Sequence, residues 1–342
     1  MRLAGLAAAL ICLAAPALGF EIEERIQYPA EQETSVLKIL STADREAFEP
    51  ILNGFQAGHP GISIDYTIAS TAEAVKAVST EGAVFDLVIS SAMDLQTKLA
   101  NDGFAADYRS AATETLPDWA KWRNELFAFS QEPAVVILND HDFPPGTGPE
   151  TREDLIALLR SDPGRFRGRI GTYDVRTSGL GYLMATQDAR TSETFWRLVE
   201  VMGRLSPKLY CCSGDMLHDV ESGRLALAYN VLGSYAAGQQ AVTGGFRIVE
   251  LADYSAVMLR TVLISKTAPN RAAAGAMVDF LVSLGSRPDL TAASGLPAID
   301  ARALSANAAL RPIRLGPGLL VFLDRLKRES FLRNWEAAIA QE

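Results

Sequence analysis

The chain has 342 residues, of which 48% are hydrophobic and 21% charged, and its formal net charge is -9. This length exceeds what one hydrophobic core usually fills and predicts two domains, while the ordinary composition excludes a disordered or low-complexity chain. The negative charge argues against nucleic acid or an anionic membrane as a partner, so any bound anion has to be captured locally.

The N-terminus has the pattern of a secretory signal peptide. Arg2 precedes an apolar stretch over residues 3–15, and the small residues Ala17 and Gly19 suit a signal peptidase. An acidic segment follows too soon for a membrane-spanning helix. We therefore expect residues 1–19 to be removed by cleavage near Gly19, with Ala17 as the alternative, and the mature protein to be soluble on the far side of the membrane.

Short apolar runs then alternate with amphipathic stretches, which is typical of an α/β fold with a largely parallel sheet. In the first part of the chain, strands are expected at residues 36–40, 62–68 and 85–90, with helices near residues 48–55, 72–80 and before Gly103. The apolar run at residues 134–138 leads into a turn-rich segment, and we interpret it as a crossing to a second domain.

The second domain repeats the same alternation. Its strands are expected at residues 169–173, 225–230 and 246–251, with helices after Thr151 and near residues 178–189 and 193–205. A second long apolar run at residues 256–265 is suited to crossing back, and helices follow near residues 269–285 and 319–339. The predicted first lobe is discontinuous, at residues 34–132 and 256–342, and the second lobe covers residues 133–255.

Enzyme motifs are missing from the chain. There is no G-x-S-x-G, H-E-x-x-H or P-loop sequence, and the three histidines, His59, His141 and His218, lie far apart on turns or a helix. We interpret them as surface or capping residues, and no cofactor is expected. A catalytic triad assembled from distant residues remains an alternative.

Two adjacent cysteines remain once Cys12 is removed with the leader, namely Cys211 and Cys212. In an oxidising compartment they can form a vicinal disulfide, bond between chains or stay as buried thiols. We favour a structural role. Two sulfurs without a neighbouring histidine or third cysteine are a weak metal signal, and an arsenite-binding dithiol is a minor alternative.

Small hydroxyl or amide residues recur where a predicted strand ends and a helix begins. In open α/β sheets these turns gather at the carboxyl edge, where the amides at helix N-termini attract an oxyanion. For any single junction, the alternative is that serine and threonine are favoured helix caps. The residues are Ser41, Thr42, Ser70, Thr71, Ser90, Ser91, Thr177, Ser178 and Asn230.

The segment at residues 173–183 has the most specific pattern. It places Arg176 at the end of a strand, directly before hydroxyl residues and two glycines that open a helix. Backbone amides, hydroxyls and a guanidinium in this order suit one phosphate or carboxylate. The alternative is a surface ion pair of Arg176 with Asp174 or Asp188.

The chain resembles the type II periplasmic solute-binding proteins of ABC importers, in the branch that includes ferric-iron, polyamine and sugar-phosphate binders. The likeness covers nearly the whole mature chain. It rests on the strand-turn-helix opening at residues 36–66 and on the motifs FDLVISSAMD, GRIGTYDVRTSGLGYL, LALAYNVLGSYA and SGLPAID in this order. It implies a two-lobe α/β fold with mainly parallel sheets and two crossing strands, whose lobes close on a solute like a hinge.

The resemblance also implies a set of solute contacts. Iron is disfavoured because iron binders use neighbouring tyrosines, whereas Tyr229 is followed by Asn230, and a polyamine is disfavoured because the junctions carry hydroxyls rather than carboxylates. A small organic anion such as a sugar phosphate or phosphonate fits better. The implied contacts are Ser41, Thr42, Ser70, Thr71, Ser90 and Ser91 on the first lobe, and Arg176, Thr177, Ser178, Gly179, Tyr229 and Asn230 on the second.

We therefore expect a monomeric periplasmic receptor that delivers a small phosphorylated or carboxylated solute to an ABC permease in the inner membrane and performs no bond chemistry. The first alternative is a sensory protein that presents its solute to a membrane histidine kinase. A secreted hydrolase or transferase is the second.

Overall fold

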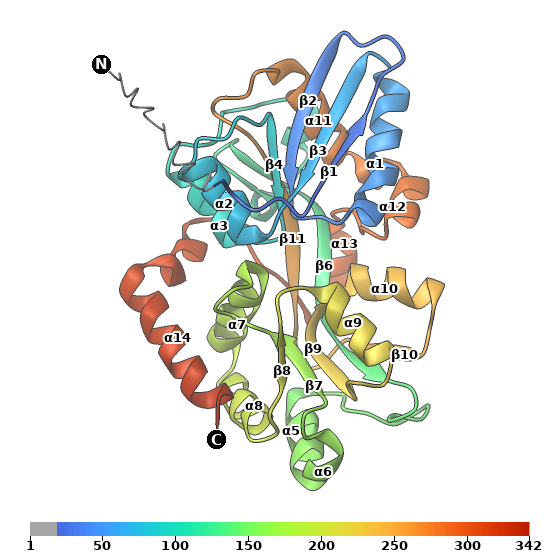
Figure 1. The fold of residues 1–342 in the computed structure, drawn as a ribbon, viewed down its shortest axis with the longest axis vertical. Helices are drawn as coiled ribbons and strands as arrows, with labels where there is room; N and C mark the ends of the chain where they lie inside the picture. The colour runs from blue at the N-terminus through green and yellow to red at the C-terminus, as the bar shows by residue number, and fades with distance from the viewer. Residues whose placement is uncertain (1–18, 342) are drawn as a thin grey trace, which may run out of the picture.

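The computed structural model describes residues 19–341, so the predicted signal peptide lies outside the described residues except for Gly19. Two lobes stand one above the other in Figure 1, and two long strands run between them: β6 (Leu126–Asn139) and β11 (Ser255–Ile264). The expected two-lobe α/β architecture with two crossing strands is confirmed.

The first lobe is built on β1 (Glu24–Tyr28), β2 (Ser35–Ser41), β3 (Ile62–Ile68) and β4 (Leu87–Ser90) in the order β1-β3-β2-β4-β11. β2 pairs in parallel with β3 and β4, as the apolar runs predict. The antiparallel edge strand β1 is not predicted from the sequence. The main helices are α1 (Arg45–Gly58), α2 (Thr71–Ser79), α3 (Met93–Asn101) and α11 (Arg271–Val282).

Helical spacing of large apolar residues explains how α1 packs on this sheet. Phe48, Ile51, Leu52 and Phe55 are fully buried on one face of the helix, in the core that also holds Ile39 of β2. Because the sheet is covered on both sides, β3 and β4 are buried almost throughout, although Ser63, Asp65 and Thr67 alternate with apolar residues along β3.

The second lobe contains β7 (Ile170–Tyr173), β8 (Lys208–Tyr210), β9 (Leu227–Leu232) and β10 (Phe246–Val249), and the sheet continues in the order β6-β9-β7-β8. Its helices are α5 (Arg152–Ser161), α7 (Gly179–Thr191), α8 (Thr194–Gly203), α9 (Ser213–Glu221) and α10 (Gly233–Val242). β7 pairs in parallel with both β8 and β9, so their carboxyl ends meet at one edge.

β6 is longer than the strand predicted at residues 134–138. Its first half pairs with β11 up to Pro133, and its second half pairs with β9 from Ala134 onward. The proline marks the change of partner. A residue that cannot donate to a ladder is tolerated at the end of a pairing, which is why the strand continues through Pro133.

The C-terminal segment returns to the second lobe. α14 (Arg325–Ile339) lies beside α7 and α8 in Figure 1, and the Phe331 ring lies 5.5 Å from Tyr182 and 5.4 Å from Trp196. This helix belongs to a segment expected in the first lobe, but it packs on the second. The lobe boundaries themselves stay a prediction. The short elements are α4 (Ala111–Glu114), β5 (Lys121–Trp122), α6 (Pro163–Phe166), α12 (Pro288–Ser294), α13 (Ala301–Ala306) and β12 (Leu310–Pro312).

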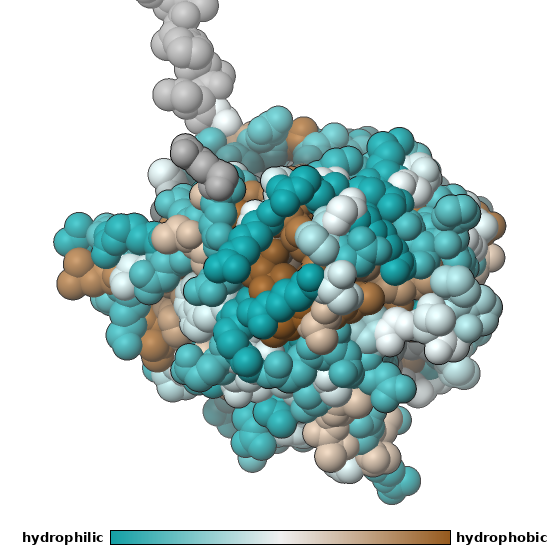
Figure 2. All heavy atoms as spheres, turned by 90° about the horizontal axis from the view of Figure 1, so that it is seen from below, coloured by the Kyte–Doolittle hydropathy of each residue, from teal (hydrophilic) through white to brown (hydrophobic). Residues whose placement is uncertain are grey.

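The outer surface at the second-lobe end is mostly hydrophilic, with hydrophobic atoms showing in a hollow between polar ridges (Figure 2). Within residues 19–341, no helix has both the length and the apolar character that crossing a membrane requires.

Candidate functional site

A cavity of about 100 Å³ lies between the lobes at the carboxyl edge of the strands. The first lobe contributes the turns after β2, β3 and β4, and the second lobe contributes the turn after β7 and the start of α9. The prediction that strand-end hydroxyls share one edge is therefore met at six positions. They are Thr42, Ser70, Thr71, Ser91, Thr177 and Ser178.

Two of these serines also cap the helices that follow them. Ser70 Oγ accepts a hydrogen bond from the amide of Glu73 at 3.2 Å, and Ser178 Oγ accepts one from the amide of Gly181 at 3.1 Å. Ser70 and Ser178 are therefore helix caps and cavity-lining residues at the same time, because each cap fixes a helix N-terminus at the cavity wall.

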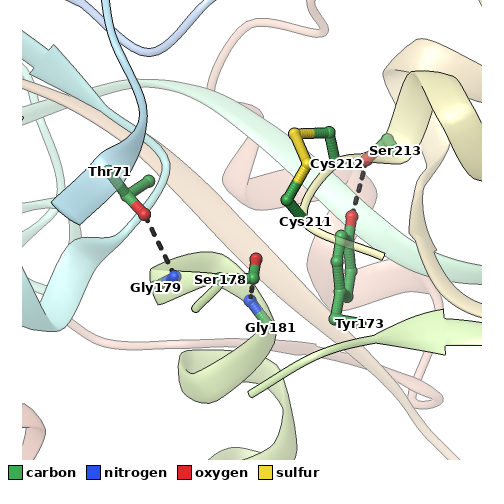
Figure 3. The surroundings of a disulfide bond; sticks show 8 residues. All are labelled: Thr71, Tyr173, Ser178, Gly179, Gly181, Cys211, Cys212 and Ser213. Atoms are coloured by element: carbon green, nitrogen blue, oxygen red, sulfur yellow. Dashed lines mark hydrogen bonds between the residues drawn. A yellow bond between two sulfur atoms is a disulfide. The ribbon is translucent and has the colours of Figure 1, made fainter. Parts of the chain in front are cut away.

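The two lobes touch each other through the rim of this cavity. The backbone amide of Gly179 on α7 donates a hydrogen bond of 3.0 Å to Thr71 Oγ1 on α2, as Figure 3 shows. The amide of Asp44 donates a second, at 3.3 Å, to the hydroxyl oxygen of Tyr235 on α10. The lobes are thus closed against one another.

Ser41 and Ser90 lie next to the cavity-lining residues but are buried below them. Ser41 Oγ accepts hydrogen bonds from the amide of Ala43 at 3.0 Å and from the Tyr66 hydroxyl at 2.8 Å. Ser90 Oγ accepts one from the amide of Ala92 at 3.1 Å. These hydroxyls shape the turns after β2 and β4 rather than line the cavity.

Arg176 does not line the cavity between the lobes. Its guanidinium forms a two-pronged ion pair with Asp174, with Nε and Nη2 at 2.8 and 2.7 Å from the carboxylate oxygens. These hydrogen bonds from Arg176 hold the pKa of Asp174 below its usual value. Arg176 faces a separate hollow that it shares with Arg328. The surface ion pair with Asp174, the alternative raised by the sequence, is the one observed.

Tyr229 and Asn230 also lie outside the cavity, in the interior of the second lobe. The Tyr229 hydroxyl accepts a hydrogen bond from Arg152 Nε and donates one to Asp188, both at 2.8 Å. Asn230 Nδ2 donates to the same carboxylate at 2.8 Å. Their polar groups hold β9, α5 and α7 together.

Arg260 on β11 is a cavity residue that the sequence did not predict. It is fully buried and lines the cavity, and it pairs with Glu132 of β6 through Nε at 3.0 Å and Nη2 at 3.2 Å. Its Nη1 has no hydrogen-bond partner among the described residues. A charged residue inside the apolar run at residues 256–265 was the signal, because buried charges require a partner or a ligand.

Two carboxylates also line the cavity, Glu23 and Asp44. Desolvation raises the pKa of Asp44, and desolvation together with the nearby Asp44 charge raises the pKa of Glu23. The cavity thus combines acidic acceptors with a guanidinium and with the N-termini of α2, α7 and α9, which carry partial positive charge.

Cys211 and Cys212 form a disulfide that lines the cavity. Figure 3 shows it beside Ser213 at the start of α9, whose hydroxyl lies 2.6 Å from the hydroxyl of Tyr173. Of the alternatives that the sequence left open, the vicinal disulfide is the one observed.

The sequence matches the family model of the bacterial extracellular solute-binding proteins over residues 37–288. The chain belongs to this family. The substrate-binding protein of an ABC transporter from Agrobacterium tumefaciens is 32% identical over 92% of this chain and 98% of its own, with a TM-score of 0.87. Among the curated proteins, none matches the sequence.

More distant solved structures share the fold of this solute-binding protein. AfuA of Actinobacillus pleuropneumoniae, with fructose-6-phosphate bound, is 15% identical over 91% of this chain and all of its own, with a TM-score of 0.70. Iron-bound HitA of Pseudomonas aeruginosa is 16% identical over 89% of this chain and 99% of its own, with a TM-score of 0.67. The expected resemblance to type II periplasmic solute-binding proteins of ABC importers is confirmed.

Proposed function

We propose that this solute-binding protein is the periplasmic receptor of an ABC importer and that it captures a small phosphorylated or carboxylated organic solute between its lobes. The observation that carries the proposal is Arg260 Nη1, a donor of a cavity-lining guanidinium that has no hydrogen-bond partner among residues 19–341 and therefore favours a solute with acceptor oxygens, as a phosphate or carboxylate group has. A buried donor left unpaired costs about 1–3 kcal/mol, and an acceptor atom on the solute offsets that cost.

Glu132 already balances the charge of Arg260, so the solute is recognised by directed hydrogen bonds rather than by an excess positive charge. The Glu132 carboxylate also accepts hydrogen bonds from Ser130, at 2.8 Å, and from Ser234, which fixes its position. A held carboxylate orients the guanidinium in turn. The nearby N-termini of α2, α7 and α9 each add a partial positive charge of about +0.5.

The carboxylates of Glu23 and Asp44 favour a solute that also donates hydrogen bonds. Hydroxyl groups on the carbon skeleton satisfy this requirement, and a solute with only anionic groups does not. The receptor therefore favours a hydroxylated anion over a bare one.

The size of the cavity limits the solute. A single enclosed water needs about 10–15 Å³ of cavity volume. A cavity of about 100 Å³ therefore accepts a solute of about seven to ten non-hydrogen atoms. Three-carbon phosphates and hydroxy acids have this size.

The comparisons support the transport role, and the distant structures include both a sugar-phosphate complex and an iron complex. The relative from Agrobacterium tumefaciens is described as the substrate-binding protein of an ABC transporter, and AfuA was solved with a sugar phosphate. A ferric ion has less support, because Tyr229 is engaged by Arg152 and Asp188 inside the second lobe. In residues 19–341 there is no cluster of three or more histidine, cysteine, aspartate or glutamate side chains that could hold a metal ion.

Thermal unfolding with a panel of solutes tests the proposal. The panel contains glycerol 3-phosphate, glycerate, inorganic phosphate, spermidine and ferric citrate. We expect the organic anions to raise the melting temperature by mass action, and Arg260→Lys, which keeps the charge opposite Glu132 but lacks the forked donors, to weaken their binding at least about tenfold. Arg176→Ala is the control and should bind as the unmodified protein does. Stabilisation only by spermidine or ferric citrate, or binding that ignores Arg260→Lys, contradicts the proposal.

A further inference from the structure

The Cys211–Cys212 disulfide occupies an unusual place in the cavity wall. Apart from two tyrosines, five residues with apolar side chains line the cavity, and three of them, Ala69, Leu180 and Leu232, are at most 7% exposed. Both cysteines, by contrast, are exposed. The disulfide is therefore, together with the half-buried ring of Tyr235, an apolar part of the wall that a solute can reach.

The chemistry of this surface differs from that of its surroundings. A disulfide sulfur has no proton to donate, whereas the neighbouring wall is made of hydroxyls such as Thr177, Ser178 and Tyr173. Sulfur is also polarisable and packs well against apolar groups. A C–H surface is the partner that fits it.

The disulfide also determines how α9 begins. Cys212 is the cap residue of this helix, and its side chain makes no capping hydrogen bond because the sulfur is bonded to Cys211. A serine there would accept a bond from the first turn. Ser213 and Gly214 at the start of α9 line the cavity next to the disulfide.

Global stabilisation does not explain the bond. A disulfide stabilises a fold mainly by closing a loop of the unfolded chain, and the loop between adjacent residues is the shortest there is. The disulfide therefore affects the local shape of the chain at residues 211 and 212.

We propose that the Cys211–Cys212 disulfide is a specificity element of the solute site, where it contacts the carbon skeleton of the solute and selects organic over inorganic anions. This inference rests on the proposed function, since the anion is held by Arg260 while the skeleton lies against the sulfurs. The solute class is a small phosphorylated or carboxylated polyol.

The test compares two probes, glycerol 3-phosphate and inorganic phosphate, by calorimetric titration. The readout is the ratio of their affinities. In the double variant Cys211→Ser/Cys212→Ser we expect this ratio to fall about tenfold, which is the effect of about 55 Å² of apolar contact at about 25 cal/mol per Å². The double variant Cys211→Ala/Cys212→Ala keeps an apolar surface and should lose less.

Chemical reduction provides an independent measurement on the unmodified protein. Dithiothreitol gives two electrons and two protons to the disulfide, which becomes two thiols, and is itself oxidised to a cyclic disulfide. We expect the affinity ratio to fall as in the serine variant. The serine variant treated with dithiothreitol is the control and should not change.

Each outcome distinguishes the inference from the function on which it rests. If the ratio of the two affinities is unchanged in the variants, the disulfide has no role in specificity. The same holds if both affinities fall in parallel. Neither result contradicts the proposed function. Binding of inorganic phosphate alone, or of neither probe, also overturns the inference. If glycerate too fails to stabilise the protein, the proposed function is wrong as well.

Discussion

The hydroxyl oxygen of Thr71 and the backbone amide of Gly179 join the two lobes through a hydrogen bond of 3.0 Å. A Cβ atom at residue 179 would lie only 2.5 Å from that oxygen. The first turn of α7 therefore reaches α2 because residue 179 has no side chain. Closure of the lobes depends on this approach.

Gly179→Ala is expected to hinder closure and weaken solute capture. The added methyl group has to push α2 away, so the closed state loses stability while each lobe keeps its own core. We expect at least a tenfold weaker affinity for glycerol 3-phosphate, about 1.4 kcal/mol, with a more open shape in small-angle scattering. Gly238→Ala on α10 is the control, because its Cβ would meet nothing within 4 Å. Equal affinities of the two variants would contradict the role of this contact.

The ion pair of Arg260 and Glu132 is fully buried, and removing one partner leaves an unpaired charge. We expect Arg260→Met to lower the free energy of unfolding by about 3–5 kcal/mol in urea denaturation. The double variant Arg260→Met/Glu132→Leu removes both charges and should recover most of this loss, without recovering solute binding. If the double variant were as unstable as the single one, the loss of stability would come from altered packing and not from the unpaired charge.

The variant Tyr229→Phe tests whether Tyr229 stabilises the second lobe or contributes to solute binding. The change removes a hydroxyl that contacts Arg152 and Asp188, so two buried polar groups lose a partner. We expect the free energy of unfolding to fall by about 1–3 kcal/mol and the solute affinity to stay unchanged. A selective loss of affinity would place Tyr229 in the binding site after all.

The strands and helices around the cavity were predictable because their apolar patterns are strong. The sequence predicted a strand at residues 62–68, which is the extent of β3, and a helix near residues 48–55, which lies within α1. The edge strand β1 was missed because an exposed strand paired on one side has little apolar pattern.

The individual contacts were harder to predict than the edge on which they lie. Neighbouring residues in an extended chain point to opposite sides, so the pattern did not tell that Thr42 rather than Ser41 lines the cavity. β9 ends at Leu232, two residues later than predicted, which moves Asn230 from the strand end into the strand. Arg260 was hidden because only the fold brings β11 to the cavity.

Stability is also expected to depend on pH through Asp94 on α3. Burial raises the pKa of this carboxyl to about 7, and its side chain is only 2% exposed. In the unfolded chain its pKa is about 3.9, so between about pH 4 and pH 7 the folded state binds the proton more tightly than the unfolded state. This contribution to stability is complete below that window and is lost as the pH rises through it.

Asp94→Asn removes the titrating group while keeping the shape of the side chain. Its free energy of unfolding, measured by urea denaturation between pH 4.5 and pH 7.5, should therefore fall less with rising pH than that of the unmodified protein. Each unit of pKa difference corresponds to about 1.4 kcal/mol, so the gap between the two curves should widen by a few kcal/mol across the window. Asp102→Asn is the matched control at the end of the same helix, because Lys98 lowers rather than raises the pKa of Asp102. Parallel curves for Asp94→Asn and the unmodified protein would mean that this carboxyl titrates in the folded protein as it does in the unfolded chain.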